Sequence, residues 1–159
     1  MLWQEVPTEM GPLGIAVDDA GLCRVDFRGS PGTSSPDPLL DEAAGQLKRY
    51  FAGELSAFDL PLSVTEGSPF ERAVWQAIAA IPYGQMRTYG EIAADVGAPD
   101  GARAVGVACN RNPLPVVVPC HRVVGAGGKL VGFGGGLPRK RFLLGLEARV
   151  RIERDFSTG

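Results

Sequence analysis

The sequence predicts an α+β protein with an N-terminal α/β domain over residues 1–67 and a mainly helical C-terminal domain over residues 68–159. Over the first thirty residues apolar and polar side chains alternate, as they do in strands that bury one face. The second half instead carries repeated helix-start motifs. A polar stretch from Ser63 to Ser68 separates the two patterns and is the best candidate for a linker.

Strands are expected first. The alternating segments at residues 13–17 and 22–27 are bordered by glycines, which predicts a β-hairpin or a meander. Residues 29–38, with the sequence GSPGTSSPDP, have the composition of a loop.

A helix should follow this loop. Asp37 is suited to cap its N-terminus, and Pro38 suits the first helical position. The amphipathic pattern then continues to about Ala52, and Gly53 ends it. Residues 58–62 predict one more short extended segment.

The second half opens with two capping boxes, in which Ser or Thr is followed three residues later by Glu: Ser68 with Glu71, and Thr88 with Glu91. They predict helices over 69–80 and 89–96, and a helix of small residues is expected over 101–110. Two short helices joined by a turn of about four residues match a helix-turn-helix. An ordinary helical hairpin would match the same pattern.

The charge of the whole chain points away from nucleic acid, because 16 basic and 18 acidic residues give a net charge of −2. The distribution points the other way. Residues 1–70 carry −7 and the remainder +5, which is a local signal for nucleic-acid binding, although a solvated basic helix would give the same count.

The sequence gives no sign of a membrane segment or a secretion signal. No apolar run approaches the roughly 20 residues that a membrane span needs, and the N-terminus lacks a basic region followed by an apolar stretch. We therefore expect a cytoplasmic protein that does not contact a membrane. The three cysteines match no disulfide framework, so reduced thiols are expected.

The segment most suggestive of chemistry ends at Cys120. Residues 115–119 form a β-branched run between prolines, which predicts a buried extended segment. His121, the only histidine, follows directly. A thiol with a pKa near 8.5 is a weak nucleophile at neutral pH, and a neighbouring imidazole is a common activating base. Adjacent side chains on a strand point in opposite directions, so a working pair requires a turn here.

The residues alone leave several interpretations of Cys120 open. It could be a buried structural thiol, the nucleophile of a thiol hydrolase, or one ligand of a zinc site built from all three cysteines and His121. The glycine clusters at 125–129 and 132–136 fit neither a P-loop nor a dinucleotide fingerprint. They indicate a mobile loop whose backbone comes close to another group.

Residues 112–125, with the sequence NPLPVVVPCHRVVG, resemble the active-site signature of the O6-alkylguanine-DNA alkyltransferases. This family of direct-reversal DNA repair proteins is also called methylated-DNA–protein-cysteine methyltransferases. The resemblance runs from Ser68 to about Glu147 and continues more loosely into the N-terminal half. It implies a ribonuclease H-like first domain and a second domain with a winged-helix-like helix-turn-helix.

The resemblance also implies a catalytic set. Cys120 would be the alkyl acceptor, in a single irreversible transfer from O6 of guanine, less well from O4 of thymine. His121 would be its base through a water molecule, Glu147 would orient the imidazole, and Asn112 would brace the active-site turn. No cofactor or metal is implied. The alternative is a non-catalytic sensor that binds alkylated DNA.

The expected partner is double-stranded DNA containing O6-alkylguanine, bound through the minor groove without sequence preference by a monomer that associates with the nucleoid. The target nucleotide must be flipped out of the duplex. The family's pattern makes Arg103 the arginine finger, which fills the space of the flipped nucleotide, and gives Tyr89 the rotation of a phosphate. The small residues Ala102 and Gly106 would let the helix approach the minor groove closely.

The substrate pocket would include Phe133, Gly134 and Gly135. Many relatives have a tyrosine where Phe133 stands, and its hydroxyl can donate a hydrogen bond to the leaving guanine oxygen. Because phenylalanine has no hydroxyl, this hydrogen bond would come from backbone N–H groups or water. Position 134 is glycine, so a contact that a serine hydroxyl could make there is absent. These two departures predict slower transfer or an altered substrate preference.

Overall fold

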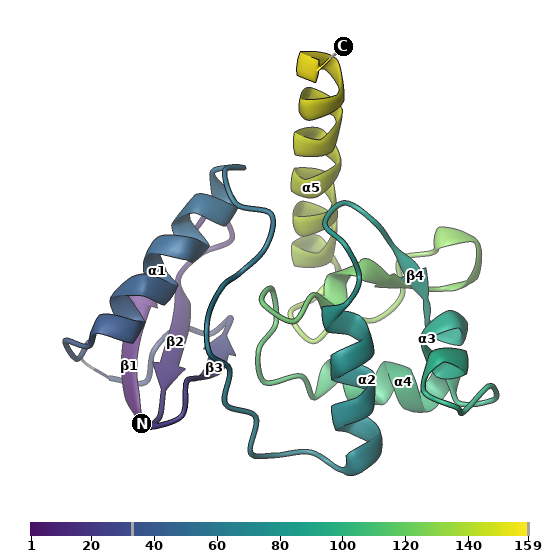
Figure 1. Cartoon of the computed structure of the whole chain (residues 1–159), viewed down its shortest axis with the longest axis horizontal. Helices are drawn as coiled ribbons and strands as arrows, with labels where there is room; N and C mark the ends of the chain where they lie inside the picture. The colour runs from purple at the N-terminus through teal and green to yellow at the C-terminus, as the bar shows by residue number, and fades with distance from the viewer. Residues whose placement is uncertain (33, 159) are drawn as a thin grey trace. The chain divides into compact units, whose positions relative to one another are not determined.

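The computed structural model describes residues 1–32 and 34–158, and the chain divides into two compact units, Met1–Glu66 and Gly67–Gly159 (Figure 1). The first unit holds strands and a helix, and the second is mainly helical, so the predicted α+β class is confirmed. None of the described helices is long and apolar enough to cross a membrane.

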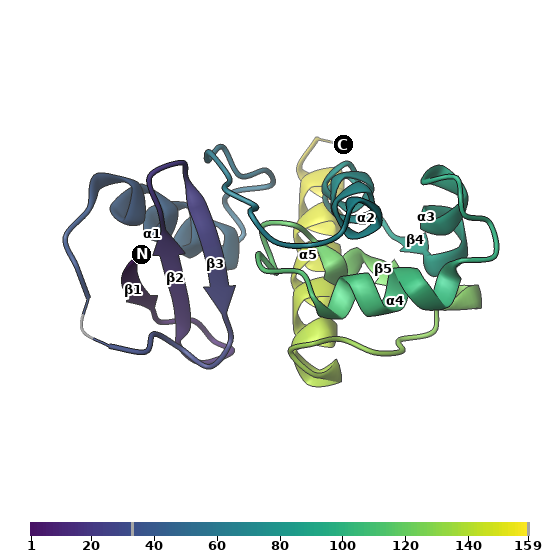
Figure 2. The same ribbon diagram turned by 90° about the horizontal axis from the view of Figure 1, so that it is seen from below.

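The first unit is a three-stranded antiparallel meander with one helix on one face (Figure 2). Its elements are β1 (Leu2–Val6), β2 (Leu13–Val17), β3 (Leu22–Asp26) and α1 (Pro38–Phe51). Central β2 is buried throughout, because β1 and β3 flank it and α1 covers it. The helix presents Leu40, Leu47 and Tyr50 to the sheet, all fully buried.

Helix α1 begins where the sequence predicts. The carboxylate of Asp37 accepts hydrogen bonds from the backbone N–H groups of Leu39 and Leu40 at 2.9 and 3.1 Å, and Pro38 occupies the first turn. The extended segment expected at 58–62 is reduced to an isolated parallel bridge between Leu22 and Leu62. Of the loop expected at 29–38, residue 33 lies outside the described residues.

The second unit contains most of the helices. Its elements are α2 (Pro69–Ala79), β4 (Arg87–Thr88), α3 (Tyr89–Asp95), α4 (Ala102–Asn110), the 3-10 turn η1 (Cys120–Arg122), β5 (Val123–Val124), the turn η2 (Ala126–Gly128) and α5 (Leu137–Thr158). Both capping boxes are formed, at Ser68 and at Thr88. They fix the starts of α2 and α3 through two reciprocal hydrogen bonds each.

Helices α3 and α4 pack together as the helix pair predicted from the sequence (Figure 2). Ile92 and Ala93 of α3 and Val105 and Ala108 of α4 are buried. Helix α2 supports the pair, because the indole N–H of Trp75 donates to the carbonyl of Ala108 at 2.8 Å. Strands β4 and β5 form a short parallel pair that joins the start of α3 to the end of η1.

The prediction of an extended segment over residues 115–119 is wrong. These residues form a turn, in which the N–H of Val118 donates to the carbonyl of Leu114 at 2.8 Å and Val116 has a φ of 75°. Leu114, Val116 and Val118 are nevertheless at most 5% exposed. The apolar run therefore reflects burial in the core, which a turn satisfies as well as a strand does.

Candidate active site

Cys120 lies at the start of η1, directly after this turn, and is 2% exposed. Asn112 holds the turn closed: its side-chain amide donates to the carbonyl of Val118 and to Sγ of Cys120, both at 2.9 Å. The amide oxygen of Asn112 accepts from the N–H of Leu114 at 2.9 Å. One side chain thus fixes both the backbone of the turn and the position of the sulfur.

His121 is fully buried, and its Nε2 lies 2.7 Å from Oε2 of Glu147 on α5. Among the described residues its Nδ1 has no hydrogen-bond partner. Burial lowers the pKa of His121 despite the neighbouring carboxylate, so the imidazole is neutral at pH 7. With Nε2–H donating to Glu147, Nδ1 keeps its lone pair and is able to take up a proton.

Glu147 is the charged centre of this cluster. Burial by itself would raise its pKa, but hydrogen bonds from His121 and Arg122 outweigh that effect and lower the pKa to about 2. Nε and Nη2 of Arg122 donate to the two carboxylate oxygens at 2.8 and 3.0 Å. The N–H of Gly84 adds a fourth contact at 3.1 Å. The carboxylate is therefore ionised and held rigidly.

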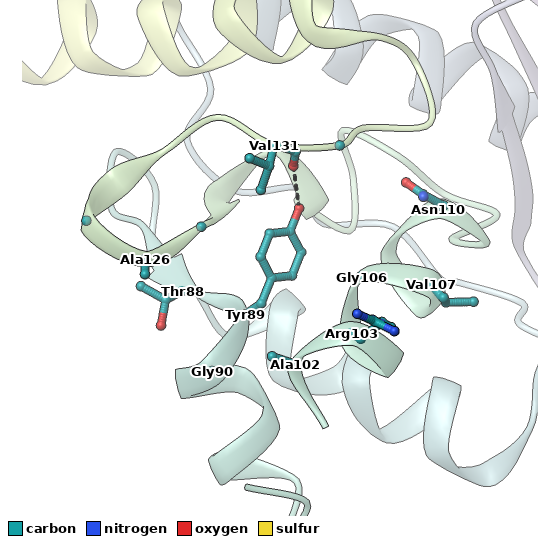
Figure 3. A pocket seen from close by; sticks show the side chains of 13 residues that line it. Thr88, Tyr89, Gly90, Ala102, Arg103, Gly106, Val107, Asn110, Ala126 and Val131 are labelled. Carbon is teal, nitrogen blue, oxygen red and sulfur yellow. Dashed lines mark hydrogen bonds between the residues drawn. The ribbon is translucent and has the colours of Figure 1, made fainter. Parts of the chain in front are cut away.

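A cavity of about 790 Å³ lies between α3, α4 and the glycine-rich loop after β5 (Figure 3). Tyr89, Ala102, Arg103 and Gly106 line it, together with Val107, Asn110, Val131 and the glycines at 125, 127 and 132. Arg103 is exposed on α4 at the cavity. The residues of α4 that line the cavity include the small Ala102 and Gly106, and a Cβ at Gly106 would reach ordinary van der Waals contact with the ring of Tyr89, at 3.9 Å.

Tyr89 joins the helix pair to the glycine-rich loop. Its hydroxyl donates to the carbonyl of Val131 at 2.9 Å, the contact drawn in Figure 3. Nζ of Lys140, a fully buried side chain of α5, lies 3.3 Å from that hydroxyl and donates to the carbonyls of Val131 and Gly132 at 3.3 and 3.1 Å. Burial raises the pKa of Tyr89 to about 12, so the hydroxyl stays protonated.

Comparisons with known proteins agree over nearly the whole chain. Residues 69–149 match the family model described as 6-O-methylguanine DNA methyltransferase, DNA binding domain. Residues 1–64 match its ribonuclease-like domain. The methylated-DNA–protein-cysteine methyltransferase of Methanosarcina acetivorans is 50% identical over 145 residues, which cover 87% of this chain and 92% of the relative. That of Mycobacterium tuberculosis strain H37Rv is 46% identical over 151 residues, 91% of each chain.

The chain belongs to the methylated-DNA–protein-cysteine methyltransferase family. The crystal structure of Mycobacterium tuberculosis OGT in complex with DNA superposes with a TM-score of 0.84 at 46% identity, over 93% of each chain. The expected ribonuclease-like first domain and helical DNA-binding second domain are thereby confirmed, and the protein is an O6-methylguanine DNA methyltransferase of DNA repair.

In this methyltransferase the residues expected to be catalytic gather around one turn: Asn112 contacts Cys120, and His121, the next residue of η1, contacts Glu147. Tyr89, Ala102, Arg103 and Gly106 gather instead at the cavity. The described lining of that cavity does not include Phe133, Gly134 or Gly135. Gly134 lies beside it, because a Cβ there would meet the carbonyl of Asn110 at 3.5 Å.

Sequence reasoning missed the parts that Arg122 and Lys140 play in the methyltransferase. Arg122 binds both oxygens of Glu147 and donates to the carbonyl of Ile81 at 2.7 Å, and Lys140 binds the glycine-rich loop. Arg122 follows His121 in a strongly apolar segment, and a cation there must be paired when it is buried. No comparable local signal marks Lys140.

Proposed function

We propose that Cys120 accepts the alkyl group from O6 of guanine, and less readily from O4 of thymine, in double-stranded DNA. The observation that carries this proposal is the arrangement of two fixed pairs on consecutive residues of η1: Asn112 holds the Cys120 sulfur, and Glu147 holds the buried imidazole of His121. A nucleophile, a base and a group that orients the base are the parts that thiol activation requires.

The proposed reaction moves one proton before one alkyl group. Burial raises the pKa of the Cys120 thiol, so at pH 7 it needs a base. The proton passes through a water molecule to Nδ1 of His121, and the ionised Glu147 stabilises the imidazolium that forms. The sulfur then forms a bond to the alkyl carbon as the carbon–O6 bond breaks, and the leaving guanine takes up a proton.

The product is a thioether, which has no easy leaving group. Each protein molecule therefore acts once, and the transfer is irreversible. Phe133 has no hydroxyl, so hydrogen-bond donation to the leaving guanine oxygen falls to backbone N–H groups of the glycine-rich loop or to water, and water supplies the proton that the guanine takes up. We expect this loss to slow transfer or change the preferred alkyl group.

For DNA we propose docking of α4 in the minor groove, with the lesion flipped toward the cavity. Three features support this: the excess of basic residues after residue 70, the small residues on the open face of α4, and the relative crystallised with DNA. Arg103 would fill the space of the flipped nucleotide and Tyr89 would turn the phosphate. Contacts to phosphates carry no sequence information, which suits a monomer that repairs lesions in any DNA sequence context.

Mass spectrometry after incubation with a duplex containing O6-methylguanine tests the proposal. We expect the mass of one methyl group on the peptide that contains Cys120, and none on that peptide in Cys120→Ser. The rival function is a sensor that binds alkylated DNA without repairing it. Unmodified protein bound to lesion DNA would establish that rival, and repeated turnover on an ester or peptide would indicate a thiol hydrolase.

A further inference from the structure

The turn between α2 and β4 supplies one of the hydrogen bonds that hold Glu147. The N–H of Gly84 donates to Oε1 of the carboxylate at 3.1 Å, and the N–H of Gln85 closes the turn on the carbonyl of Pro82 at 3.1 Å. Pro82 is exposed, and Tyr83 and Gly84 are half-buried, so burial alone does not fix this turn. A backbone donor is only as well placed as the turn that carries it.

The last part of α5 braces this turn from outside. Nη1 of Arg151 donates to the carbonyl of Gly84 at 3.0 Å. A Cβ at Gly84 would meet Cδ of Arg151 at 3.0 Å, so the stem of this side chain lies directly against the turn. The guanidinium of Arg154 lies 5.5 Å from the centroid of the Tyr83 ring, within the range of a cation–π contact. Accordingly, the segment between α2 and β4 runs beside α5 in Figure 1.

Arg122 binds the same turn from inside. Its Nη1 donates to the carbonyl of Ile81 at 2.7 Å, and its guanidinium also lies 5.5 Å from the centroid of the Tyr83 ring. Its Nε and Nη2 bind the two oxygens of Glu147. The turn is therefore held on one side by the arginine that binds the carboxylate and on the other by the two arginines of α5.

We infer that Arg151 and Arg154 are positioning residues for alkyl transfer: they fix the turn that carries the Gly84 N–H, and thereby the carboxylate that orients His121. The inference rests on the proposed function, because Glu147 acts on the imidazole there. Both arginines lie beyond residue 149, where the match to the family's DNA-binding domain ends. Their support of the site is therefore not part of the matched domain.

The orientation of the carboxylate matters because His121 becomes charged in the proposed reaction. Oε2 of Glu147 lies 2.7 Å from Nε2 of the imidazole, while Oε1 accepts from the N–H of Gly84. If the turn loosens, the carboxylate loses one of its fixed donors, and its orientation against Nε2 is less well defined. A reacting group that is slightly misplaced slows the reaction although the group itself remains.

Two measurements test the inference: the single-turnover rate of alkyl transfer at a saturating concentration of duplex containing O6-methylguanine, and nitrogen NMR of the imidazole. The double variant Arg151→Met/Arg154→Met keeps long side chains and removes both guanidinium groups. We expect its rate to fall about three- to tenfold and the ring-nitrogen resonances of His121 to move from their positions in the parent protein. His121 is the only histidine, so its resonances need no further assignment. Saturation with DNA removes the effect of the lost charges on binding.

The matched control is Arg141→Met/Arg149→Met, which removes the same charge from two exposed positions of α5 and should match the parent in rate and resonances. The inference is overturned if the two double variants react at the same rate. It is also overturned if the rate falls while the His121 resonances stay in place, because the loss would then not pass through the imidazole.

The NMR measurement does not depend on alkyl transfer. If the protein takes up no methyl, but the His121 resonances move in Arg151→Met/Arg154→Met and not in the control, the proposed function is overturned and the support of Glu147 by α5 is retained.

Discussion

At the scale of single residues, Glu147 links the base to the rest of the fold, because its carboxylate accepts from His121, Arg122 and Gly84. In Glu147→Gln the imidazole loses its anionic partner and Arg122 is left as a buried cation without one. We expect the single-turnover alkyl-transfer rate to fall at least about 10²-fold, the usual contribution of a positioned base. The control is Glu153→Gln, an exposed position on the same helix, and equal rates in both variants would contradict the assignment.

The same carboxylate makes stability depend on pH. Its pKa is lowered from about 4.5 to about 2 on folding, so its stabilisation is complete above pH 4.5 and is lost as the pH falls toward 2. The lost stabilisation amounts to about 3 kcal/mol. Chemical denaturation at pH 7 and at pH 3 measures the part of this stabilisation that is lost over that range, about 2 kcal/mol. The parent protein should lose more stability over this range than Glu147→Gln, and parallel curves would argue against an ionised Glu147 in the folded state.

Arg103 belongs to the same scale because its expected effect depends on one exposed side chain. Truncation in Arg103→Ala should weaken repair of a lesion in duplex DNA, since the space of a flipped nucleotide would be left empty. Reaction of Cys120 with the free alkylated base requires no flipping and should be largely preserved. Alkyl-transfer rates are measured on both substrates, and equal rate losses would show that Arg103 is not the arginine finger.

At the scale of elements, Lys140 of α5 holds the glycine-rich loop and Tyr89 in one arrangement. Lys140→Met keeps the buried aliphatic stem but leaves the carbonyls of Val131 and Gly132 without this donor. We expect a loss of about 1–3 kcal/mol in stability and faster amide exchange over residues 129–134. Arg141→Met, at the exposed neighbouring position, is the control. Unchanged exchange in Lys140→Met would show that the loop is held by other contacts.

How much of these elements is predictable depends on the range of the interactions. The starts of α2 and α3 follow from capping boxes, which act within four residues, and are accordingly predicted well. Residues 115–119 are predicted wrongly, because a β-branched run signals burial without specifying strand or turn. The contacts of Lys140 with Tyr89 span 51 residues and those of Arg122 with Glu147 span 25, distances over which a local pattern carries no information.

At the scale of the whole molecule, the distribution of charge matters more than its sum. A net charge of −2 describes neither part of the chain, since residues 1–70 carry −7 and the remainder carries +5. We expect the local excess to supply the phosphate contacts, each of which releases counterions when DNA binds. DNA affinity therefore has to be measured at several salt concentrations, because a single value does not separate the electrostatic contribution of phosphate contacts from the contribution of all other contacts.

If the second unit neutralises about four phosphates, the Kd for duplex DNA should rise about a hundredfold between about 50 and 200 mM salt. Charge reversal at exposed Lys129 in the glycine-rich loop should lower the slope of log Kd against log salt by about one or more. Reversal at exposed Lys48 of α1 should leave the slope unchanged. Fluorescence anisotropy with an unmodified duplex measures all three slopes. A flat response in the parent protein, or a larger change at Lys48 than at Lys129, would mean that DNA is not bound through the basic residues of the second unit.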